Sequence, residues 1–147
     1  MGSEAKMTKY CSEPSFGSYG YNGFTDTKTV LDLEDDAAYM TLGGNWCMPT
    51  EEEWAELQDN CSWEWTSMNG VDGRKVTGLN GNSIFLPAAG YRSGTNIFGA
   101  GDSGGYWSSS LFTYRSDRGY YVSFYSNDVY RIYNARYYGY SIRPVCN

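Results

Sequence analysis

The side chains best suited to chemistry in this sequence lie in its last forty-odd residues, and their chemistry is that of recognition. The segment 104–147 holds ten of the fifteen tyrosines and five of the seven arginines, and it has no lysine and no glutamate. Tyrosine offers a large amphipathic surface on few rotatable bonds, while arginine stacks on rings and donates to paired acceptors. The composition therefore favours a binding surface over the plainer alternative, a tyrosine-rich β-sheet without a ligand.

The candidate ligand contacts lie in the loop that follows Leu111 and in the two strands expected after it. They are Phe112, Tyr114, Arg115, Ser116, Asp117, Arg118, Tyr125, Ser126, Asn127, Tyr130, Arg131 and Tyr133. A buried phenol hydroxyl needs its own hydrogen-bond partner, so core packing does not account for so many tyrosines. We therefore expect the tyrosines and arginines of this set to form one exposed patch. The scaffold beneath it is expected to include Val122, Phe124, Arg136 and Gly139.

A catalytic role has little support in the residue types present. The chain has no histidine, which excludes Ser-His-Asp and Cys-His arrangements and removes the commonest metal ligand. The run Glu51–Glu53 follows Thr50, and this spacing is typical of a helix capping box rather than of a metal or catalytic cluster. We predict that the chain is not an enzyme and expect no cofactor and no metal.

Charge is divided unevenly along the chain, whose formal net charge is −6. Residues 1–105 carry six basic and fifteen acidic groups, a net charge of −9, whereas residues 106–147 carry five arginines and two aspartates, a net charge of +3. The acidic total argues against nucleic-acid binding, which needs a basic footprint. The basic terminal part favours attraction of an acidic partner.

The cysteines are four in number: Cys11, Cys47, Cys61 and Cys146. Their spacing includes no C-x-x-C pair, so a zinc knuckle or a thioredoxin-type site is not expected. An even number spread over the chain predicts two disulfides in an oxidising compartment, with three pairings open. The alternative is four free thiols in a cytosolic protein.

Residues 8–147 are long enough for one domain with a real core. The first seven residues resemble a cloning remnant or linker, and we expect a natural leader or anchor to have been removed. The sequence has no apolar run long enough to cross a bilayer.

Two helices and a series of antiparallel strands are expected within this domain. The first helix is expected to begin at a cap formed by Asp32 and to end at Gly43. The second begins at the cap Thr50, and Trp54 and Leu57 lie on its apolar stripe. Alternating residues and turn signals then predict strands near residues 74–77, 83–86, 120–125, 129–133 and 141–145. A glycine-rich loop is expected over residues 93–106.

Four motifs give the chain a resemblance to a known family. They are GGNWCMPTEEEW (43–54), FLPAAGYR (85–92), GYWSSS (105–110) and SIRPV (141–145). In this order they resemble the Fibrobacter succinogenes major paralogous domain. That family is grouped with C-type-lectin-fold proteins, including the variable proteins of diversity-generating retroelements. The resemblance runs from about residue 8 to the end, and Cys47 stands where the family motif has arginine.

The resemblance implies an α+β, C-type-lectin-like fold in which two helices pack on antiparallel sheets with long loops. It also implies a rigid frame, so Trp46, Trp54, Trp107 and Arg143 are expected to be largely buried. The ligand face would be a variable segment at about 111–140, rewritten at codons that cannot yield Lys, Glu, Gln, Met or Trp. None of these five residue types occurs from Leu111 to Tyr140.

The implied function is recognition at an extracellular or cell-surface location, with a protein or glycan partner on a cell, phage or host surface. No nucleic acid and no direct membrane span are expected. The formylglycine-generating enzymes share the fold, but they need a reactive cysteine pair. The alternatives are a carbohydrate-binding lectin module, although the lectin calcium motifs are missing, and a structural surface or pilus-tip subunit. The last would need an exposed edge strand.

Overall fold

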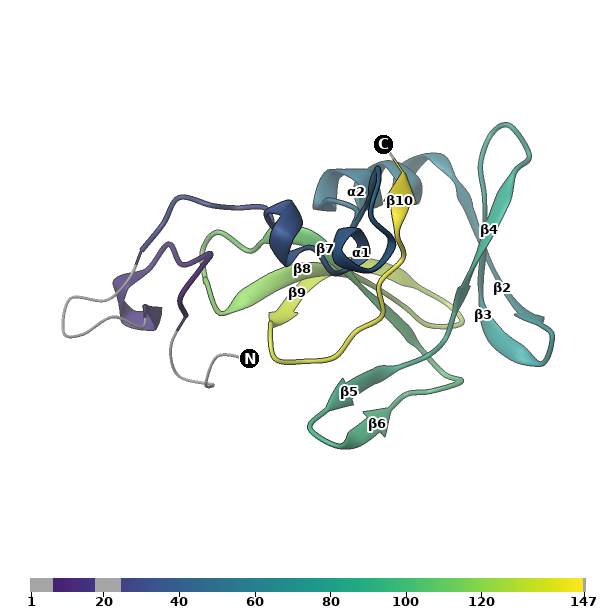
Figure 1. Cartoon of the computed structure of the whole chain (residues 1–147). Coiled ribbons are helices and arrows are strands. Elements are labelled where there is room, and N and C mark those ends of the chain that lie inside the picture. The colour runs from purple at the N-terminus through teal and green to yellow at the C-terminus, as the bar shows by residue number, and fades with distance from the viewer. Residues whose placement is uncertain (1–6, 18–24, 147) are drawn as a thin grey trace.

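The computed structural model describes residues 7–17 and 25–146, so the expected loop around 19–23 and most of the expected linker at 1–7 lie outside the described residues. The fold is α+β, with mostly antiparallel sheets (Figure 1). The helical elements are η1 (Pro14–Phe16), η3 (Leu33–Asp35), α1 (Ala37–Leu42) and α2 (Glu51–Asn60). The strands are β1 (Trp46–Cys47), β2 (Ser62–Met68), β3 (Val71–Thr77), β4 (Ser83–Pro87), β5 (Tyr91–Ser93), β6 (Asn96–Phe98), β7 (Gly104–Leu111), β8 (Arg118–Phe124), β9 (Val129–Ala135) and β10 (Val145–Cys146).

The two α-helices form where capping chemistry is available. The Thr50 hydroxyl accepts from the Glu53 N–H (3.2 Å) and the Glu53 carboxylate accepts from the Thr50 N–H (2.7 Å), which confirms the capping box. Asp32 precedes only the short 3-10 helix η3 and its side chain makes no cap bond, whereas the side chain of Asp36 caps α1, so the expected start of this helix is wrong. Asp36 is buried, and its carboxylate also accepts from the Met48 N–H at 2.8 Å. This long-range bond explains why the helix begins later than expected.

The strands form small antiparallel sheets ordered β2-β3-β4 and β7-β8-β9, with β1 pairing β10 and β5 pairing β6. The strands expected near 74–77, 83–86, 120–125 and 129–133 correspond to β3, β4, β8 and β9. The loop expected over 93–106 is wrong in part, since this range contains the end of β5, all of β6 and the start of β7. The expected terminal strand is reduced to β10 and a bridge from Ser141 to Tyr106.

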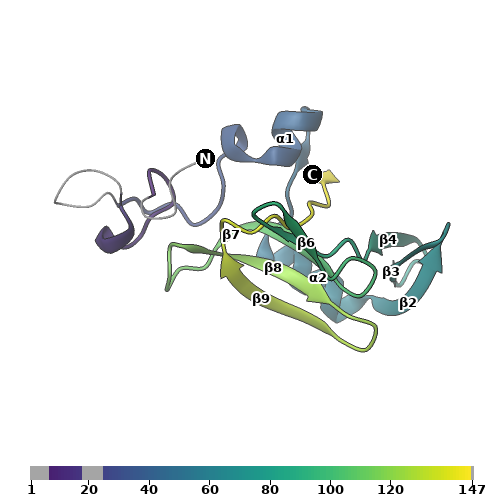
Figure 2. The ribbon, with the colours of Figure 1, turned by 90° about the horizontal axis from the view of Figure 1, so that it is seen from below.

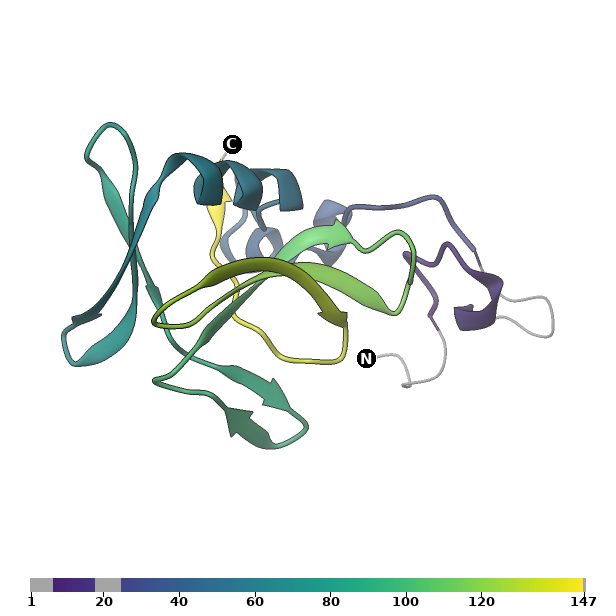
Figure 3. The same ribbon diagram turned by 180° about the vertical axis from the view of Figure 1, so that it is seen from behind.

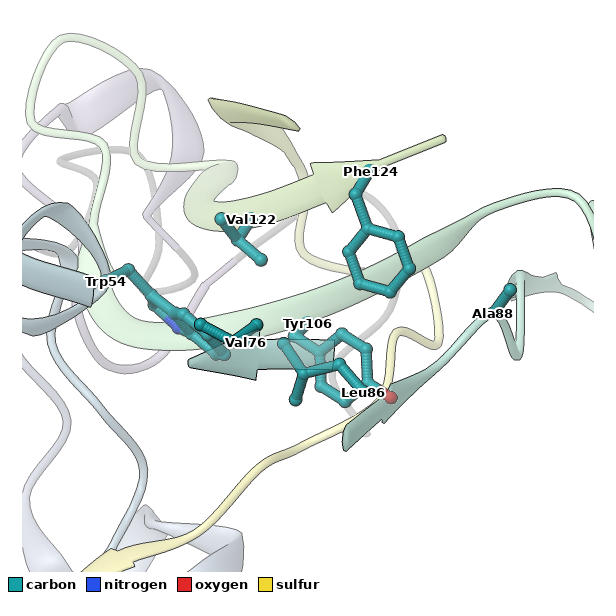
Figure 4. Packing of buried hydrophobic residues seen from close by; sticks show 7 residues of the cluster. All are labelled: Trp54, Val76, Leu86, Ala88, Tyr106, Val122 and Phe124. Atoms are coloured by element: carbon teal, nitrogen blue, oxygen red, sulfur yellow. The ribbon is translucent and has the colours of Figure 1, made fainter. Parts of the chain in front are cut away.

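The core lies where α2, the β3–β4 hairpin and the β7-β8-β9 sheet meet (Figure 4). Its members are Trp54, Val76, Leu86, Ala88, Tyr106, Val122 and Phe124. Val122 and Phe124 are fully buried, as expected of scaffold residues, and Trp54 is 3% exposed. Burying such side chains stabilises the fold by about 1.5–3 kcal/mol each.

Two of the frame residues are not buried, and the expectation for them is wrong. Trp46 is 41% exposed because it lies on the two-residue strand β1, which pairs only with β10. Arg143 is exposed in the irregular segment before β10. Trp107 is half-buried, and its indole N–H donates to the Tyr138 carbonyl at 3.2 Å. The frame is therefore built on Trp54 and Trp107 rather than on all four residues.

The cysteines do not form the two disulfides expected from their number. Cys11 is a buried thiol whose Sγ lies 3.1 Å from the Glu13 carbonyl oxygen, and Cys61 is a half-buried thiol at the start of β2. Cys11 belongs to the N-terminal segment and Cys61 to the α2–β2 junction, so no pairing of all four residues exists. Cys11 and Cys61, as thiols, therefore give no support to an oxidising compartment. No helix among the described residues is long and apolar enough to cross a membrane.

Candidate functional site

The β8–β9 hairpin carries many of the candidate ligand contacts, and its register decides on which face each one lies. Side chains alternate along a strand, and residues paired across a hairpin share a face. Arg131 pairs with the buried Val122, and Tyr133 lies two residues further along the same face. Tyr130 pairs with Ser123 and lies on the opposite face. The candidates on β9 are thus divided between the two faces of the sheet.

An aromatic cluster forms where the loop after β7 meets the far end of this hairpin. The ring of Phe112 stacks on that of Tyr133, with centroids 3.8 Å apart and an interplanar angle of 14°. Phe112 also meets Tyr120 edge-on at 5.4 Å and Tyr114 at 5.7 Å. The Arg118 guanidinium lies 5.5 Å from the Tyr133 ring centroid. We refer to Phe112, Tyr114, Arg118, Tyr120 and Tyr133 as the Phe112 cluster.

Much of the Phe112 cluster is open to solvent. The exposed fraction is 78% for Tyr114 and 40% for Tyr133, while Phe112, Arg118 and Tyr120 are half-buried. Aromatic contacts of this kind contribute about 0.5–1.5 kcal/mol each beyond the area they bury. The rings are therefore held in place by one another while still presenting a surface to a partner.

Arg118 is the polar group of this cluster that lacks a partner. Its Nε is buried and has no hydrogen-bond acceptor, and no carboxylate of the described residues forms an ion pair with its guanidinium. A buried N–H without an acceptor is rare and costs about 1–3 kcal/mol. The terminal amino groups of this guanidinium are not among its buried atoms, and a ligand with paired oxygen acceptors would bind them, because guanidinium groups bind such acceptors well.

The arginines beside this cluster are already paired. Arg115 forms a two-bond ion pair with Asp117 (3.1 and 3.0 Å), and Arg131 approaches Glu51 at 3.8 Å and Asp59 at 3.7 Å. The positive charge counted in the terminal segment is therefore partly offset by carboxylates, two of them on α2. The expected attraction of an acidic partner by a broad basic patch is weakened accordingly.

Ser116 is a correction to the set of candidate contacts. It is fully buried, and its hydroxyl accepts from the backbone N–H groups of Ser12 (2.8 Å) and Glu13 (3.2 Å). It therefore fastens the N-terminal segment to the loop after β7 and does not face a ligand. The Arg136 guanidinium also joins the two segments, because it donates to the carbonyls of Tyr10 (3.2 Å) and Ser116 (3.1 Å). This agrees with the expected role of Arg136 in the scaffold.

The remaining candidates surround the turn at the other end of the hairpin. The turn is closed by a bond from the Tyr125 N–H to the Asp128 carbonyl at 2.9 Å. The turn group consists of Tyr125, Ser126, Asn127 and Tyr130, all exposed. A hydrogen bond between the Tyr130 side chain and the Asp128 side chain raises the pKa of the Tyr130 phenol. Along β9, Tyr130 of this group is only three residues, or roughly 10 Å, from Tyr133 of the Phe112 cluster, but the two side chains lie on opposite faces of the sheet.

The structure therefore divides the expected single patch into two groups. The candidate tyrosines are exposed, as expected, but those of the turn group and those of the Phe112 cluster do not adjoin. Tyr120 was not among the expected contacts, although its strand was expected; it pairs with Tyr133 across the hairpin and so lies on the same face as the cluster.

Other tyrosines of the segment 104–147 pack within the fold, as expected of a tyrosine-rich β-sheet without a ligand. Tyr140 stacks on Tyr121 with centroids 4.3 Å apart, meets Trp107 edge-on at 4.8 Å and accepts a hydrogen bond from Asn134 at 2.7 Å. Burial is the main cause that raises the pKa of the Tyr140 phenol. These rings cover the second face of the β7-β8-β9 sheet.

An acidic group near the N-terminus is the one arrangement of the described residues that resembles a metal site. The carboxylates of Asp32, Glu34 and Asp35 lie within 4.8 Å of one another. Lys9 Nζ bonds Glu34 at 2.7 Å and Asp35 at 2.8 Å, and Lys28 bonds Asp32. The positive charges of Lys9 and Lys28 thus offset the negative charges of these carboxylates, and the group is an ion-pair network.

Comparison with models of protein families, with curated proteins and with solved structures finds no match to this chain.

Proposed function

We propose that this chain is a ligand-recognition domain of the C-type-lectin fold, of the kind displayed on a bacterial or phage surface and diversified by a retroelement. Its partner is a protein or a glycan on a cell, phage or host surface. The four motifs that resemble the Fibrobacter succinogenes major paralogous domain support this family. Two α-helices and antiparallel sheets joined by long loops are compatible with the fold.

The observation that carries the proposal is the Phe112 cluster with its unpartnered arginine. Binding hot spots are rich in tyrosine and arginine, and they are strongest where the side chains are held in place before the partner arrives. Stacking of Phe112 on Tyr133 and of Arg118 over Tyr133 provides this order. The cluster thus combines exposed apolar area with a donor that needs an acceptor.

The arrangement of the variable segment also supports the proposal. Val122 and Phe124 are fully buried, whereas Tyr114, Tyr125 and Tyr130 are exposed at the ends of the hairpin. Substitution at the exposed positions removes few core contacts, so a rewritten segment would keep its fold. Ser116 is the exception, because its hydroxyl accepts hydrogen bonds from the backbone N–H groups of Ser12 and Glu13.

An array screen tests this function. The whole chain is labelled and applied to protein and glycan arrays, with and without a calcium chelator, beside the variants Phe112→Ala and Leu79→Ala. Leu79 is 95% exposed in the turn between β3 and β4, and is the matched control because Figure 1 shows this turn well away from the loop after β7. We expect a chelator-insensitive ligand whose binding falls about 30-fold or more in Phe112→Ala and is unchanged in Leu79→Ala.

Each other outcome of the screen has a defined meaning. Loss of binding with chelator would favour the calcium-dependent lectin alternative. Equal behaviour of Phe112→Ala and the wild type would show that the ligand binds elsewhere on the chain. The absence of any ligand in both classes would contradict the proposed function.

A structural subunit is the second candidate, and the open outer edge of β9 favours it, because strand addition needs such an edge. Sedimentation separates the two candidates. A subunit of this kind would form polymers whose size increases with protein concentration, while a recognition domain without strand exchange would remain one species.

A further inference from the structure

The outer edge of β9 has backbone groups whose direction can be worked out from the hairpin. The bond from Tyr125 N–H to the Asp128 carbonyl makes this pair a hydrogen-bonded one, and hydrogen-bonded pairs alternate along an antiparallel ladder. At the other end of the hairpin, the Arg136 N–H donates to the Asp117 carbonyl (3.0 Å), which makes Asp117 and Arg136 a hydrogen-bonded pair, as the alternation requires. The β9 residues that direct their N–H and C=O groups away from β8 are therefore Val129, Arg131, Tyr133 and Ala135.

Both ends of this outer edge are already capped by the chain itself. The Gln58 side-chain amide donates to the Val129 carbonyl at 3.0 Å. The Asn134 side chain accepts from the Ala135 N–H at 2.8 Å, and the Tyr138 N–H donates to the Ala135 carbonyl at 3.2 Å.

The middle of the edge is open. Within the described chain, the N–H and C=O groups of Arg131 and Tyr133 have no hydrogen-bond partner. We call these four groups the free edge of β9, and Figure 2 shows β9 as the outermost strand of its sheet. Natural proteins protect such edges with proline, a bulge or charged side chains. β9 has no proline and no bulge, and its one charged residue, Arg131, turns toward the carboxylates of α2. The free edge therefore accommodates a short extended segment of another chain.

The charge next to the free edge selects among possible occupants. Helix α2 lies along β9 on the core-facing side (Figure 3) and carries five acids, Glu51, Glu52, Glu53, Glu56 and Asp59, and no base. Arg131 is the cation that approaches α2 here, and Glu52 and Glu56 are exposed. A second copy paired edge to edge would bring two acidic helices together, which disfavours it. A segment with a basic side chain on this face is favoured instead.

The position of that basic side chain follows from the contacts of α2. Gln58 lies beside Val129, so the C-terminal end of α2 is next to the start of β9. Burial, then the negative charges of Glu51 and Glu52, raise the pKa of Tyr120, which pairs with Tyr133. The N-terminal acids therefore lie near Tyr133. On the opposite face, Ile132 is 43% exposed and offers an apolar contact to the neighbouring residue of the segment.

We propose that the partner is a protein whose extended segment adds to the free edge of β9, bonds the backbone of Arg131 and Tyr133, and places a basic side chain near Glu51 and Glu52 with an apolar neighbour on Ile132. This inference rests on the proposed function, because it assigns the partner of the same surface to proteins rather than glycans. Backbone bonds would supply affinity, and the two side-chain contacts would supply specificity.

The test selects peptides from a phage-displayed library of random twelve-residue segments on the whole chain and measures their affinity for paired variants. Arg131→Pro and Tyr133→Pro remove an N–H that faces away from β8, so the β8–β9 ladder is kept. Arg131→Ala and Tyr133→Ala remove the same side chains but keep the N–H. We expect each proline variant to bind at least about tenfold more weakly than its alanine counterpart.

A second variant pair and a second measurement cover a failure of the proline variants to fold. Glu52→Gln should weaken the selected peptides with a basic residue more than Glu56→Gln does. Hydrogen exchange of the wild-type chain should show slower exchange at the Arg131 and Tyr133 amides when a peptide is bound. Equal binding by proline and alanine variants, or unchanged exchange at both amides, would overturn the inference.

The remaining outcomes distinguish this inference from the proposed function. If no peptide is selected but a glycan binds the Phe112 cluster, the strand addition fails and the recognition function stands. If no ligand of either class binds, the recognition function fails as well. A concentration-dependent dimer that is lost in Arg131→Pro and retained in Arg131→Ala would assign the edge to a second copy and overturn the proposal.

Discussion

Gly104→Ala should destabilise the chain far more than Gly119→Ala, the same change on the neighbouring strand. A Cβ added at Gly104 would lie 2.6 Å from Cε2 and 2.7 Å from Cε1 of Phe124, and closer still to Cζ. Carbon atoms pack best at about 3.5–4.0 Å. Phe124 is fully buried and stacks on Tyr106 with centroids 6.0 Å apart, so its ring has no free space to move into.

The magnitude follows from this crowding. Overpacking a well-filled core costs about 1–3 kcal/mol, and we expect the upper end because the added methyl meets the ring itself. For a chain of this length about 3 kcal/mol lowers Tm by roughly 6–12 °C. The matched control is Gly119→Ala on the neighbouring strand, where the added Cβ would meet Trp107 at an ordinary distance of 3.5 Å. That change should alter the free energy of unfolding by less than about 0.5 kcal/mol.

Urea unfolding followed by tryptophan fluorescence measures both variants beside the wild type. The expected result is a lower midpoint for Gly104→Ala at an unchanged slope, with Gly119→Ala close to the wild type. If the two variants unfold at the same midpoint, the packing of Phe124 against β7 is not as described, and the support of the hairpin by the core is refuted.

Three further predictions concern titration, thiols and the N-terminal segment. Burial raises the pKa of Tyr106 to about 12 from 10.0, so the unfolded chain loses this proton first and the free energy of unfolding falls as pH rises from about 10 to about 12. Urea unfolding at pH 9 and pH 11 should show a smaller fall in the free energy of unfolding for Tyr106→Phe than for the wild type. Thiol titration should find Cys61 reactive in the native chain and Cys11 reactive only after unfolding, and an inert Cys11 in the unfolded, unreduced chain would contradict its assignment as a free thiol. Ser116→Ala removes the acceptor of two backbone N–H groups and should cost about 1–3 kcal/mol, with faster limited proteolysis of the N-terminal segment; a proteolysis rate equal to that of the wild type would show that Ser116 does not fasten it.

Local chemistry made part of the fold predictable from the sequence. The capping box of Thr50 and Glu53 acts over three residues, and the alternation in β8 and β9 acts between neighbours, so both were found correctly. The cap of α1 was misplaced because Asp36 is selected over Asp32 by a bond to Met48, twelve residues away. Such a bond leaves no periodic signal in the chain.

The site was predictable in composition but not in arrangement. The exposure of Tyr114 and Tyr133 follows from the surplus of phenol groups in the segment, whereas the burial of Ser116 depends on Ser12, which is 104 residues away. The separation of Tyr130 from Tyr133 could have been found, because their spacing of three residues places them on opposite faces of any regular strand. The free edge of β9 required the strand order, which the sequence does not specify.

The most direct measurement of the recognition function compares Arg118→Gln with Arg115→Gln. Both changes remove one positive charge, from the loop after β7 or from the first residue of β8, but Arg118 lacks an acceptor whereas Arg115 is paired with Asp117 at 3.0 Å. The dissociation constant of the best ligand from the arrays is measured for both variants and the wild type, with Tm as a check on folding. We expect Arg118→Gln to weaken binding about 30-fold or more and Arg115→Gln by less than about threefold, with Tm nearly unchanged in both. Equal dissociation constants for the two variants would contradict the assignment of the Phe112 cluster as the ligand site.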